Sequence, residues 1–332
     1  MSDSTKIDIS IILPVYNVEQ YLEACLDSIL DQKGGSWQII AVNDASTDNS
    51  LDVLNAYKKK NEVDLKIISS KTNQGAGYAR NVALKHVQGD YTMFVDSDDL
   101  LKPDSFSRLL AIAHSRLSDI VVFTYDLWYD TANALSPMFQ QDRLIWDGIL
   151  NGKSIVGKRL QDCPHFLTTI NFPWNKLYKT SFLLDEKIRF SETMVNNDIY
   201  AHWQSLMLAK QITLVDEVYY THRNFQTGQQ ITNYFDERRF ELFTALEEVD
   251  DLMHSNSMFM ENYYAYYLLF KLGLFRWVLS RMPEDLMAEF FDKVKKSTSH
   301  FSKKDFLLGA HQMPNVYNEI VKMKFSLHPD FS

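Results

Sequence analysis

Short apolar runs alternate with amphipathic helical patterns over the first 125 residues, and this alternation limits the folds that the chain can adopt. The runs expected to form buried strands are residues 9–13, 37–42, 65–68, 91–95 and 120–125. The patterns expected to form helices between them are residues 18–30, 48–59, 75–87 and 103–115. Strands that alternate with helices favour a mainly parallel sheet with helices on both faces. The predicted fold class is therefore α/β.

The rest of the chain follows different patterns. Residues 126–197 are less regular and rich in aromatic and turn residues, and a helical pattern covers residues 198–210. Two short strands are expected at residues 212–215 and 218–220, and the pattern is then helical from about residue 233 to residue 324. We therefore expect two domains, residues 1–233 and an all-helical extension at residues 234–332, because domains usually have ~100–200 residues.

The composition excludes several classes of function. A formal net charge of −9 argues against nonspecific nucleic-acid binding, which needs a basic surface. Cys25 and Cys163 show no metal-ligand spacing and no disulfide framework is expected, so a reducing compartment is the simplest location. Residues 1–6 are polar, unlike a signal peptide, and no run reaches ~18 uncharged apolar residues. We expect a cytoplasmic protein without a transmembrane helix.

Polar clusters follow three of the expected strands, at the end where parallel sheets bind ligands. They are residues 14–17, 43–48 and 96–99. Alternate residues of an extended segment point to one side, so Asp96 and Asp98 can converge. Close carboxylates need a positive neighbour, and a hard divalent cation supplies one and can bridge a diphosphate. An EF-hand is excluded, because Leu100 occupies the third ligand position and no glycine follows.

Six stretches of the chain resemble the family 2 glycosyltransferases of the GT-A fold, in that family's order. They are LPVYNVEQYLEACLDSIL, VNDASTDNS, NQGAGYARNVAL, YTMFVDSDD, PWNKLYKTSFL and NNDIYAHWQSLMLAKQITLVDEVYY, and they cover nearly all of residues 8–225. The resemblance implies a Rossmann-like GT-A domain with a donor half at about residues 1–125 and an acceptor half at about residues 126–233. It also implies an inverting hexosyl- or N-acetylhexosaminyltransferase that moves one sugar from a UDP-sugar to a hydroxyl of a glycan acceptor.

The resemblance assigns roles on the donor side. Tyr16 would lie against the uracil ring with the Pro14 backbone beside it, and Asp44 would hydrogen-bond the uracil. Asp96 would contact the ribose or the donor sugar. The residues expected to bind the donor are Pro14, Tyr16, Asn17, Asp44, Arg80, Asn81, Asp96 and Ser97. Residues 46–48 are instead interpreted as caps of the following helix.

A divalent cation, Mn²⁺ or Mg²⁺, is also implied by the resemblance. Asp98 would bind it between the two phosphates of the donor, with Asp96 beside it. His222 follows the strand expected at residues 218–220, where some relatives carry a histidine near the metal or the diphosphate, and is the third candidate ligand. A lone histidine is more often structural, and this alternative stays open.

Arg80 stands out from its position alone. In the helix expected from residue 75, the apolar stripe consists of Ala76, Ala79, Ala83 and Val87. Arg80 lies beside that stripe and near the helix N-terminus, where the helix dipole disfavours a cation. It is therefore expected to face an anion, and the resemblance places it with Asn81 near the donor. The alternative is a surface arginine whose stem covers apolar groups.

The acceptor hydroxyl needs a base, because it is a poor nucleophile until its proton is removed. The family resemblance assigns this role to the aspartate of a Glu-Asp pair that opens a helix. The matching pair in this chain is Asn197-Asp198, so Asp198 is the predicted base, and it is also a candidate cap for its helix. Asn197 keeps a hydrogen-bonding group but lacks the charge of the usual glutamate.

The aromatic tail leaves three alternatives. Tyr263, Tyr264, Tyr267, Leu268 and Phe275 belong to a dense apolar stretch that predicts a helical core packed on the catalytic part. A contact between subunits of a homo-oligomer is the second alternative, and peripheral membrane docking is the third.

Two other functional classes are alternatives to the transferase. A sugar-phosphate nucleotidyltransferase would need a glycine-rich, arginine-containing signature near the first strand, and none follows Tyr16. A noncatalytic scaffold with the transferase fold remains the alternative, motivated by Asn197. Processive synthesis is not expected, because Gly273 stands where the processive motif requires glutamine.

Overall fold

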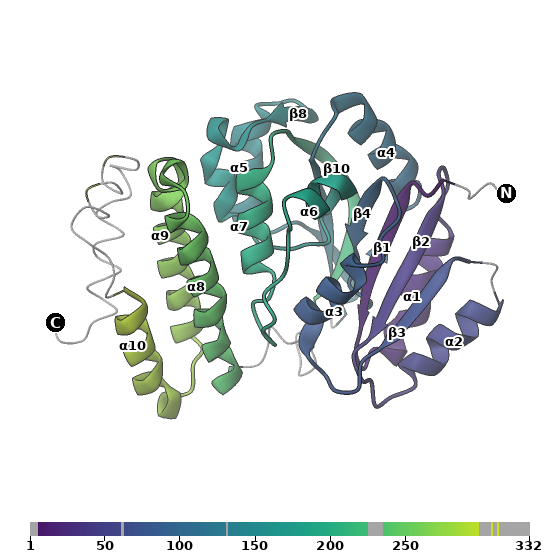
Figure 1. Ribbon diagram of the computed structural model, residues 1–332, viewed down its shortest axis with the longest axis horizontal. Coiled ribbons are helices and arrows are strands. Elements are labelled where there is room, and N and C mark those ends of the chain that lie inside the picture. Colours follow the sequence, from purple (N-terminus) through teal and green to yellow (C-terminus); the bar gives the residue numbers. More distant parts are fainter. Residues whose placement is uncertain are drawn as a thin grey trace.

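The computed structural model describes residues 6–60, 63–130, 132–224 and 235–298, together with residues 307 and 311. Figure 1 shows a helix-flanked sheet that occupies most of the molecule and a group of helices packed against one end. The first part alternates strands and helices as expected. Its elements are β1 (Ile9–Val15), α1 (Glu19–Leu30), β2 (Trp37–Asn43), α2 (Ser50–Lys60), β3 (Leu65–Ser69), α3 (Gly75–Leu84) and β4 (Tyr91–Phe94).

The elements that follow complete the sheet and build the helical region. The middle of the chain forms β5 (Leu100–Leu101), α4 (Ser105–Arg116), β6 (Ile120–Tyr129), β7 (Ala134–Pro137), α5 (Gln140–Leu150), β8 (Ile155–Lys158), η1 (Leu160–Asp162), η2 (Pro164–Thr168), β9 (Lys176–Lys179), α6 (Thr180–Asp185), α7 (Ile199–Leu208) and β10 (Ile212–Asn224). The helical region comprises η4 (Glu237–Phe240), α8 (Glu241–His254), α9 (Ser257–Leu279) and α10 (Glu284–Thr298).

All strands join one sheet of 10 strands, whose main path has the order β3-β2-β1-β4-β9-β6-β10-β5. The strands β1, β2, β3, β4, β6 and β10 run in one direction, whereas β5, β7, β8 and β9 run in the opposite direction. The sheet is thus mostly parallel with helices on its faces, which confirms the predicted α/β class. The carboxyl ends of β1, β2 and β4 meet at one edge, where the polar clusters lie.

The middle of the chain is more regular than expected. The described residues of 126–197 contain three further strands, two α-helices and two 3-10 helices, and β9 is inserted antiparallel between β4 and β6. The two short strands expected at 212–215 and 218–220 are one strand, β10, with register shifts around residues 215–220. The charged pair Asp216 and Glu217 interrupts the apolar pattern there, and an irregularity in the ladder accommodates it without ending the strand.

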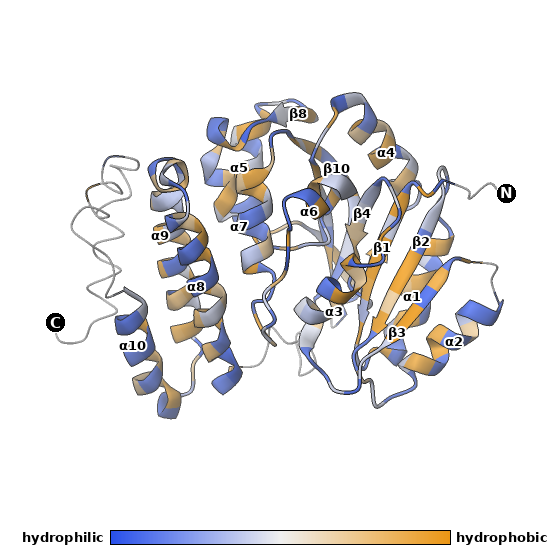
Figure 2. Cartoon of the chain, in the orientation of Figure 1, coloured by the Kyte–Doolittle hydropathy of each residue, from blue (hydrophilic) through white to orange (hydrophobic). Residues whose placement is uncertain are grey.

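The core lies between the sheet and its helices. Ile11, Ile12 and Leu13 of β1 are fully buried, because helices cover both faces of this central strand. Figure 2 shows the contrast between the hydrophobic strands β1 and β2 and the hydrophilic outer side of α2. Burial of each such side chain stabilises the fold by about 1.5–3 kcal/mol.

The aromatic stretch of α9 forms a packed core. Tyr263, Tyr264 and Tyr267 are buried, and Tyr267 meets Trp203 of α7 edge-on with ring centroids 5.3 Å apart. These contacts confirm the prediction that the tail packs on the catalytic part. The expected helical pattern at residues 299–324 and the domain boundary at residue 233 fall almost wholly outside the described residues. No helix of the described ranges has the length and apolar character needed to span a bilayer.

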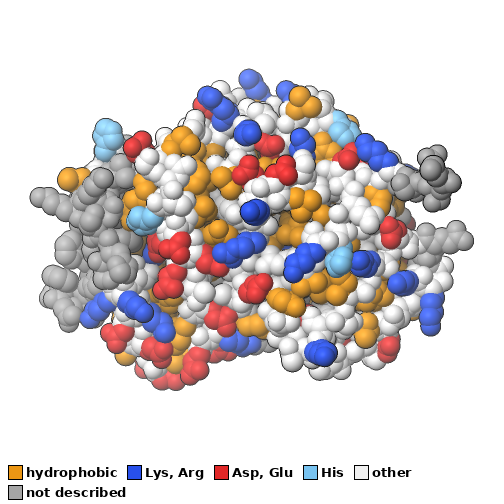
Figure 3. Space-filling model, in the orientation of Figure 1, with side chains coloured by type: hydrophobic (Ala, Val, Ile, Leu, Met, Phe, Trp, Pro, Cys, Tyr) orange, Lys and Arg blue, Asp and Glu red, His pale blue; other side chains and the backbone are white. Residues whose placement is uncertain are grey.

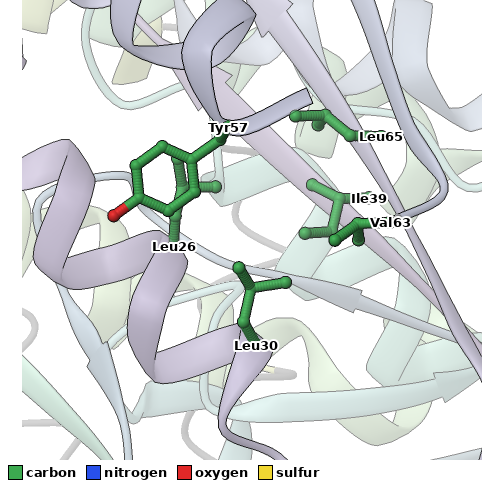
Figure 4. A pocket seen from close by; sticks show the side chains of 6 residues that line it. All are labelled: Leu26, Leu30, Ile39, Tyr57, Val63 and Leu65. Carbon is green, nitrogen blue, oxygen red and sulfur yellow. The ribbon is translucent and has the colours of Figure 1, made fainter. Parts of the chain in front are cut away.

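A small cavity lies between α1, α2 and the strands beside them (Figure 4). Its lining is apolar or aromatic and consists of Leu26, Leu30, Ile39, Tyr57, Val63 and Leu65. Its volume is ≈ 10 Å³, no more than one water molecule requires. This void is a packing feature that is too small for a ligand.

One buried ion pair links the three C-terminal helices. The Lys271 side chain is fully buried in α9, and its Nζ donates to Asp250 Oδ2 of α8 at 2.6 Å and to the Ser297 carbonyl of α10 at 3.3 Å. We expect Lys271→Met to lower the free energy of unfolding by ~3 kcal/mol, because the substitution leaves the Asp250 carboxylate without its cation. Denaturant unfolding followed by circular dichroism measures this change.

An exposed pair on α10 provides the control. Lys293 lies 3.4 Å from Glu289, and both side chains are more than one third exposed. Lys293→Met should change the free energy of unfolding by less than ~1 kcal/mol. Equal losses in the two variants would show that Lys271 holds no special place in the fold.

Candidate functional site

The loops after β1 and β2 hold each other in place. Asp48 accepts hydrogen bonds from the backbone amides of Ser50 and Glu19, each at 3.0 Å, so one carboxylate caps both α2 and α1. Glu19 accepts in return from the Asn49 amide at 2.8 Å. Burial raises the pKa of Asp48, but these hydrogen bonds lower it by more, to below its usual value. The capping role predicted for Asp48 is confirmed.

Ser46 and Thr47 differ from that prediction, because they bond Asn17 instead of capping α2. The Asn17 amide donates to Ser46 Oγ at 3.2 Å, and the Asn17 side-chain carbonyl accepts from the Thr47 amide at 2.8 Å. Asn17 has a φ of +50°, which asparagine tolerates better than most residues. Asn17 therefore shapes the loop, and its predicted contact with the donor stays a prediction.

Tyr16 and Asp44 flank the end of β1. Tyr16 is 42% exposed directly after the strand, so it is accessible to a ligand at this edge. Asp44 is 2% exposed, and its Oδ2 accepts from the amides of Gln74 and Gly75 at 2.9 and 2.7 Å. Its buried Oδ1 has no hydrogen-bond partner among the described residues. A ligand N–H at this position would complete its hydrogen bonding.

Arg80 joins the donor and acceptor halves. Its Nη2 donates to Asp96 Oδ1 at 2.6 Å, and its Nη1 donates to Asn197 Oδ1 at 2.8 Å. The side chain is almost wholly buried, which rules out the alternative of a surface arginine. The prediction that Arg80 faces an anion is borne out in that it pairs with Asp96. Its contact with the donor itself remains a prediction.

Asn81, the next residue of α3, holds the segment before α7. Its Nδ2 donates to the Phe190 carbonyl and its Oδ1 accepts from the Phe190 amide, both at 2.9 Å. These paired bonds act as a clamp between the two halves of the sheet domain. Asn81 thus has a structural role, the attachment of α3 to the Phe190 backbone, that was not predicted from the sequence.

The loop after β4 crowds three carboxylates. Asp99 is fully buried and accepts from His222 Nδ1 at 2.9 Å and from the Arg223 amide at 2.8 Å. The Asp96 amide donates to Tyr220 Oη at 3.0 Å, which fixes the start of the loop. Ser97, a predicted donor contact, is 5% exposed between them. The loop is therefore held mainly by β10.

Asp98 is the carboxylate of this loop that has no ion pair among the described residues. Burial, and then the charges of Asp99 and Asp96, raise its pKa to about 8, although the charge of His222 opposes this rise. Within the described chain no other residue donates a hydrogen bond to it, whereas Asp96 has Arg80 and Asp99 has His222. A nearby cation would keep Asp98 ionised, and its oxygens are the ligands that hard divalent ions prefer.

The arrangement suits a cation that the donor would help to bind. Across the described ranges, no three His, Cys, Asp or Glu side chains lie together as a complete metal cage. Mg²⁺ commonly uses one or two carboxylates together with substrate phosphates, so Asp98 and Asp96 are a sufficient protein contribution. Burial alone would lower the pKa of His222, but Asp99 raises it by more, to about 9. A protonated imidazole cannot bind a metal, so His222 as a ligand would first have to lose this proton.

Asp198 stands at the N-terminus of α7, but its side chain makes no cap hydrogen bond to that helix. The predicted capping role of this side chain is therefore wrong, because the carboxylate lies among other charged groups. Its pKa is raised to about 6, because burial and the charge of Asp96, which raise it, outweigh Arg80 and Lys176, which lower it. The carboxyl group is thus poised to gain or lose a proton near neutral pH, as a general base must.

Two buried residues near the site, Lys176 and Trp174, were not predicted from the sequence. Lys176 is 1% exposed and its Nζ donates to the Asn175 side chain at 2.8 Å and to the Phe172 carbonyl. Burial lowers its pKa to about 7, against the opposing charges of Asp198 and Asp142. Trp174 stacks on the rings of Tyr220 and His222, with centroids 4.5 and 5.0 Å apart. Trp174 and Lys176 both belong to PWNKLYKTSFL, and the resemblance of this stretch to the family was the sequence feature that could have indicated them.

The sheet topology and the polar edge after β1, β2 and β4 are those of a GT-A-type fold. A solved structure of Staphylococcus aureus TarS 1–349 in complex with UDP-GlcNAc shares this fold, with a TM-score of 0.75, 18% identity and coverage of 97% of this chain and 89% of that chain. A second, GalNAc-T7 with UDP, GalNAc and Mn²⁺, has a TM-score of 0.52 at 13% identity, and covers 74% of this chain and 52% of that chain.

Sequence similarity gives the family. The chain matches the family described as "Glycosyl transferase family 2" over residues 10–183, and it belongs to that family. It is 30% identical to glycosyltransferase GlyA of Streptococcus pneumoniae over 65% of this chain and 30% of GlyA. It is also 27% identical to the putative glycosyltransferase EpsH of Bacillus subtilis, over 77% of this chain and 71% of EpsH. The chain thus spans less than one third of GlyA but most of EpsH.

The His222–Asp99 pair generates a direct test. We expect the His222 imidazole to titrate with a pKa near 9, measured by NMR of the labelled ring. In Asp99→Asn the main opposing charge is lost while the burial remains, so the pKa should fall toward or below the ordinary value of ~6.5. An unchanged His222 pKa in this variant would show that Asp99 does not hold the proton. His86→Gln identifies the resonance of a partly exposed histidine for comparison.

Proposed function

We propose that this chain transfers one sugar, a hexose or an N-acetylhexosamine, from a UDP-sugar to a hydroxyl of a glycan acceptor, with inversion at the anomeric carbon. The observation that carries the proposal is the Arg80 bridge, which sets the acceptor-side segment with Asp198 against the donor-side carboxylate Asp96. A base and a donor site within one contact network are what a single displacement requires.

The donor would bind along the edge formed by the loops after β1, β2 and β4. Tyr16 offers an exposed ring for the uracil, with the Pro14 backbone beside it, and Asp44 Oδ1 offers an acceptor for its N–H. Asp98 and Asp96 would hold Mn²⁺ or Mg²⁺ against the diphosphate. The cation would supply charge compensation for the departing phosphate. The structure of TarS with UDP-GlcNAc supports UDP as the nucleotide.

The chemical step then uses Asp198. Its carboxylate accepts the proton of the acceptor hydroxyl while the oxygen forms a bond to the anomeric carbon. The bond from that carbon to the phosphate oxygen breaks, and UDP leaves with the electron pair. One displacement on the face opposite the leaving group gives inversion. Arg80 and Lys176 lower the pKa of Asp198 and so favour the ionised form that the step needs.

From the sequence we further propose a cytoplasmic location, a homo-oligomer through the C-terminal helices and peripheral membrane association. We also propose a division at residue 233 into a catalytic domain and a helical domain. A noncatalytic scaffold is the alternative function, motivated by Asn197, which Arg80 engages without a second negative charge.

A donor panel tests the function. We expect Mn²⁺-dependent release of UDP from at least one UDP-sugar in a coupled assay with candidate acceptors.

Asp98→Ala should lower the rate ~100-fold or more, because the carboxylate that holds the cation is lost. Asp198→Asn should lower kcat by a similar factor and leave UDP affinity intact. Asp52→Asn, on the exposed side of α2, is the control. Donor binding without turnover by any acceptor would favour the scaffold.

The pH dependence tests the base separately. The pKa of Asp198 is raised to about 6, and the group accepts a proton only when it is ionised. The rate should therefore fall as the pH drops through 6, by about tenfold per unit below it. A profile of kcat/KM between pH 4.5 and 8 measures this. A rate that stays level down to pH 5 would remove Asp198 from the role.

A further inference from the structure

The segment that carries Asp198 lies between the sheet domain and the helical region. We call residues 189–198 the strap. In Figure 1 it descends between α6 and α7, with α3 on one side and α8 on the other. Its own bonds are few: the Ser191 amide donates to the Asn197 carbonyl at 2.9 Å, and Thr193 Oγ1 donates to the Val195 carbonyl at 2.8 Å. Its shape must therefore be set mainly by its neighbours.

The α3 side presses closely on the strap. A Cβ at Gly77 would lie only 2.1 Å from the Ser191 carbonyl oxygen, so only glycine permits this approach. Asn81 clamps Phe190 through two bonds, and Arg80 holds the Asn197 side chain. These contacts fix the ends of the strap on the donor side.

The helical region holds the opposite side of the strap with charged groups. Glu248 of α8 accepts from Ser191 Oγ and from Arg189 Nη1, the latter at 2.8 Å. Glu241, at the start of α8, accepts from the Met194 amide. Arg239 of η4, which is 2% exposed, donates to the Asn196 side chain at 3.4 Å.

The two glutamates of α8 hold the strap at two points. Glu241 and Glu248 lie seven residues apart, two turns along one face of α8, and both reach the strap. Their carboxylates bond a backbone amide and a hydroxyl, and such charge-assisted bonds are stronger and more directional than neutral ones. Asn196 has a φ of +56°, so the backbone bends directly before the Asn197-Asp198 pair, at the residue that Arg239 holds.

We propose that Glu241, Glu248 and Arg239 of the helical region are positioning residues for Asp198. They act through the strap and touch neither donor nor acceptor. The inference rests on the proposed function, since it assigns to the helical region the placement of that function's base. A base displaced by about 1 Å loses much of its effect, so the helices are part of the active-site scaffold.

The test combines kinetics with a matched control. Glu241→Ala/Glu248→Ala should lower kcat roughly 10- to 100-fold, because the strap loses its α8 anchors. The donor KM and UDP affinity should change much less than kcat, since Tyr16, Asp44 and Asp98 lie outside the strap and only Arg80 and Asn81 of the predicted donor contacts touch it. Glu247→Ala is the control, because Glu247 is exposed on α8 and makes no strap contact within the described residues. Glu248→Gln, which keeps an acceptor for Ser191, should recover part of the kcat.

Hydrogen exchange separates this inference from the proposed function. In the free protein the amides of residues 190–197 should exchange roughly tenfold faster in the double variant, while those of β1 and β2 do not change. Unchanged kcat and unchanged exchange would overturn the inference, as would an equal loss of kcat in Glu247→Ala. If the wild type releases UDP from no donor with any acceptor, the proposed function fails. The exchange data then still decide whether α8 holds the strap.

Discussion

The buried guanidinium of Arg80 is the interaction on which the arrangement of the site depends. A cation removed from water needs close partners, and Arg80 has Asp96 on one side and Asn197 on the other. These two residues come from the loop after β4 and from the strap before α7, which are about 100 residues apart. Because Arg80 pairs with both residues, it fixes the distance between the loop after β4 and the strap that carries Asp198. Trp174 stacks on Tyr220, whose hydroxyl accepts from the Asp96 amide, and so supports the same loop.

The three carboxylates of the loop after β4 differ in whether a cation pairs with them, and this difference supports the proposed cation site. Asp96 has Arg80 and Asp99 has His222, whereas Asp98 has no such partner within the described chain. The surroundings of Asp98 raise its pKa to about 8, and carboxyl groups with strongly shifted pKa values cluster at functional sites. Figure 3 shows acidic and basic side chains mixed over one face of the molecule. The concentration of carboxylates after β4 is the local feature on which the proposed cation site rests.

The helical region gains a role that its sequence did not suggest. Its aromatic residues, above all Tyr267 against Trp203, attach it to α7, the helix that follows Asp198. Its acidic residues on α8 hold the strap that precedes Asp198. The helices thus contact the chain on both sides of Asp198, the proposed base. The similarity of fold to TarS extends over 97% of this chain and so includes these helices.

The sequence alone determined the α/β class, the donor-edge clusters after β1, β2 and β4, and the pairing of Arg80 with an anion. These features follow from local periodicity and from the rule that parallel strands end at one edge. Only the tertiary structure decided the insertion of β9, the burial of Lys176, the pairing of His222 with Asp99 and the anchoring of the strap. Each of these depends on contacts between segments distant in sequence, and no local pattern encodes which buried charge will meet which partner. His222 and Asp99, 123 positions apart, illustrate the reason: they form a pair because the sheet brings β10 beside the loop after β4.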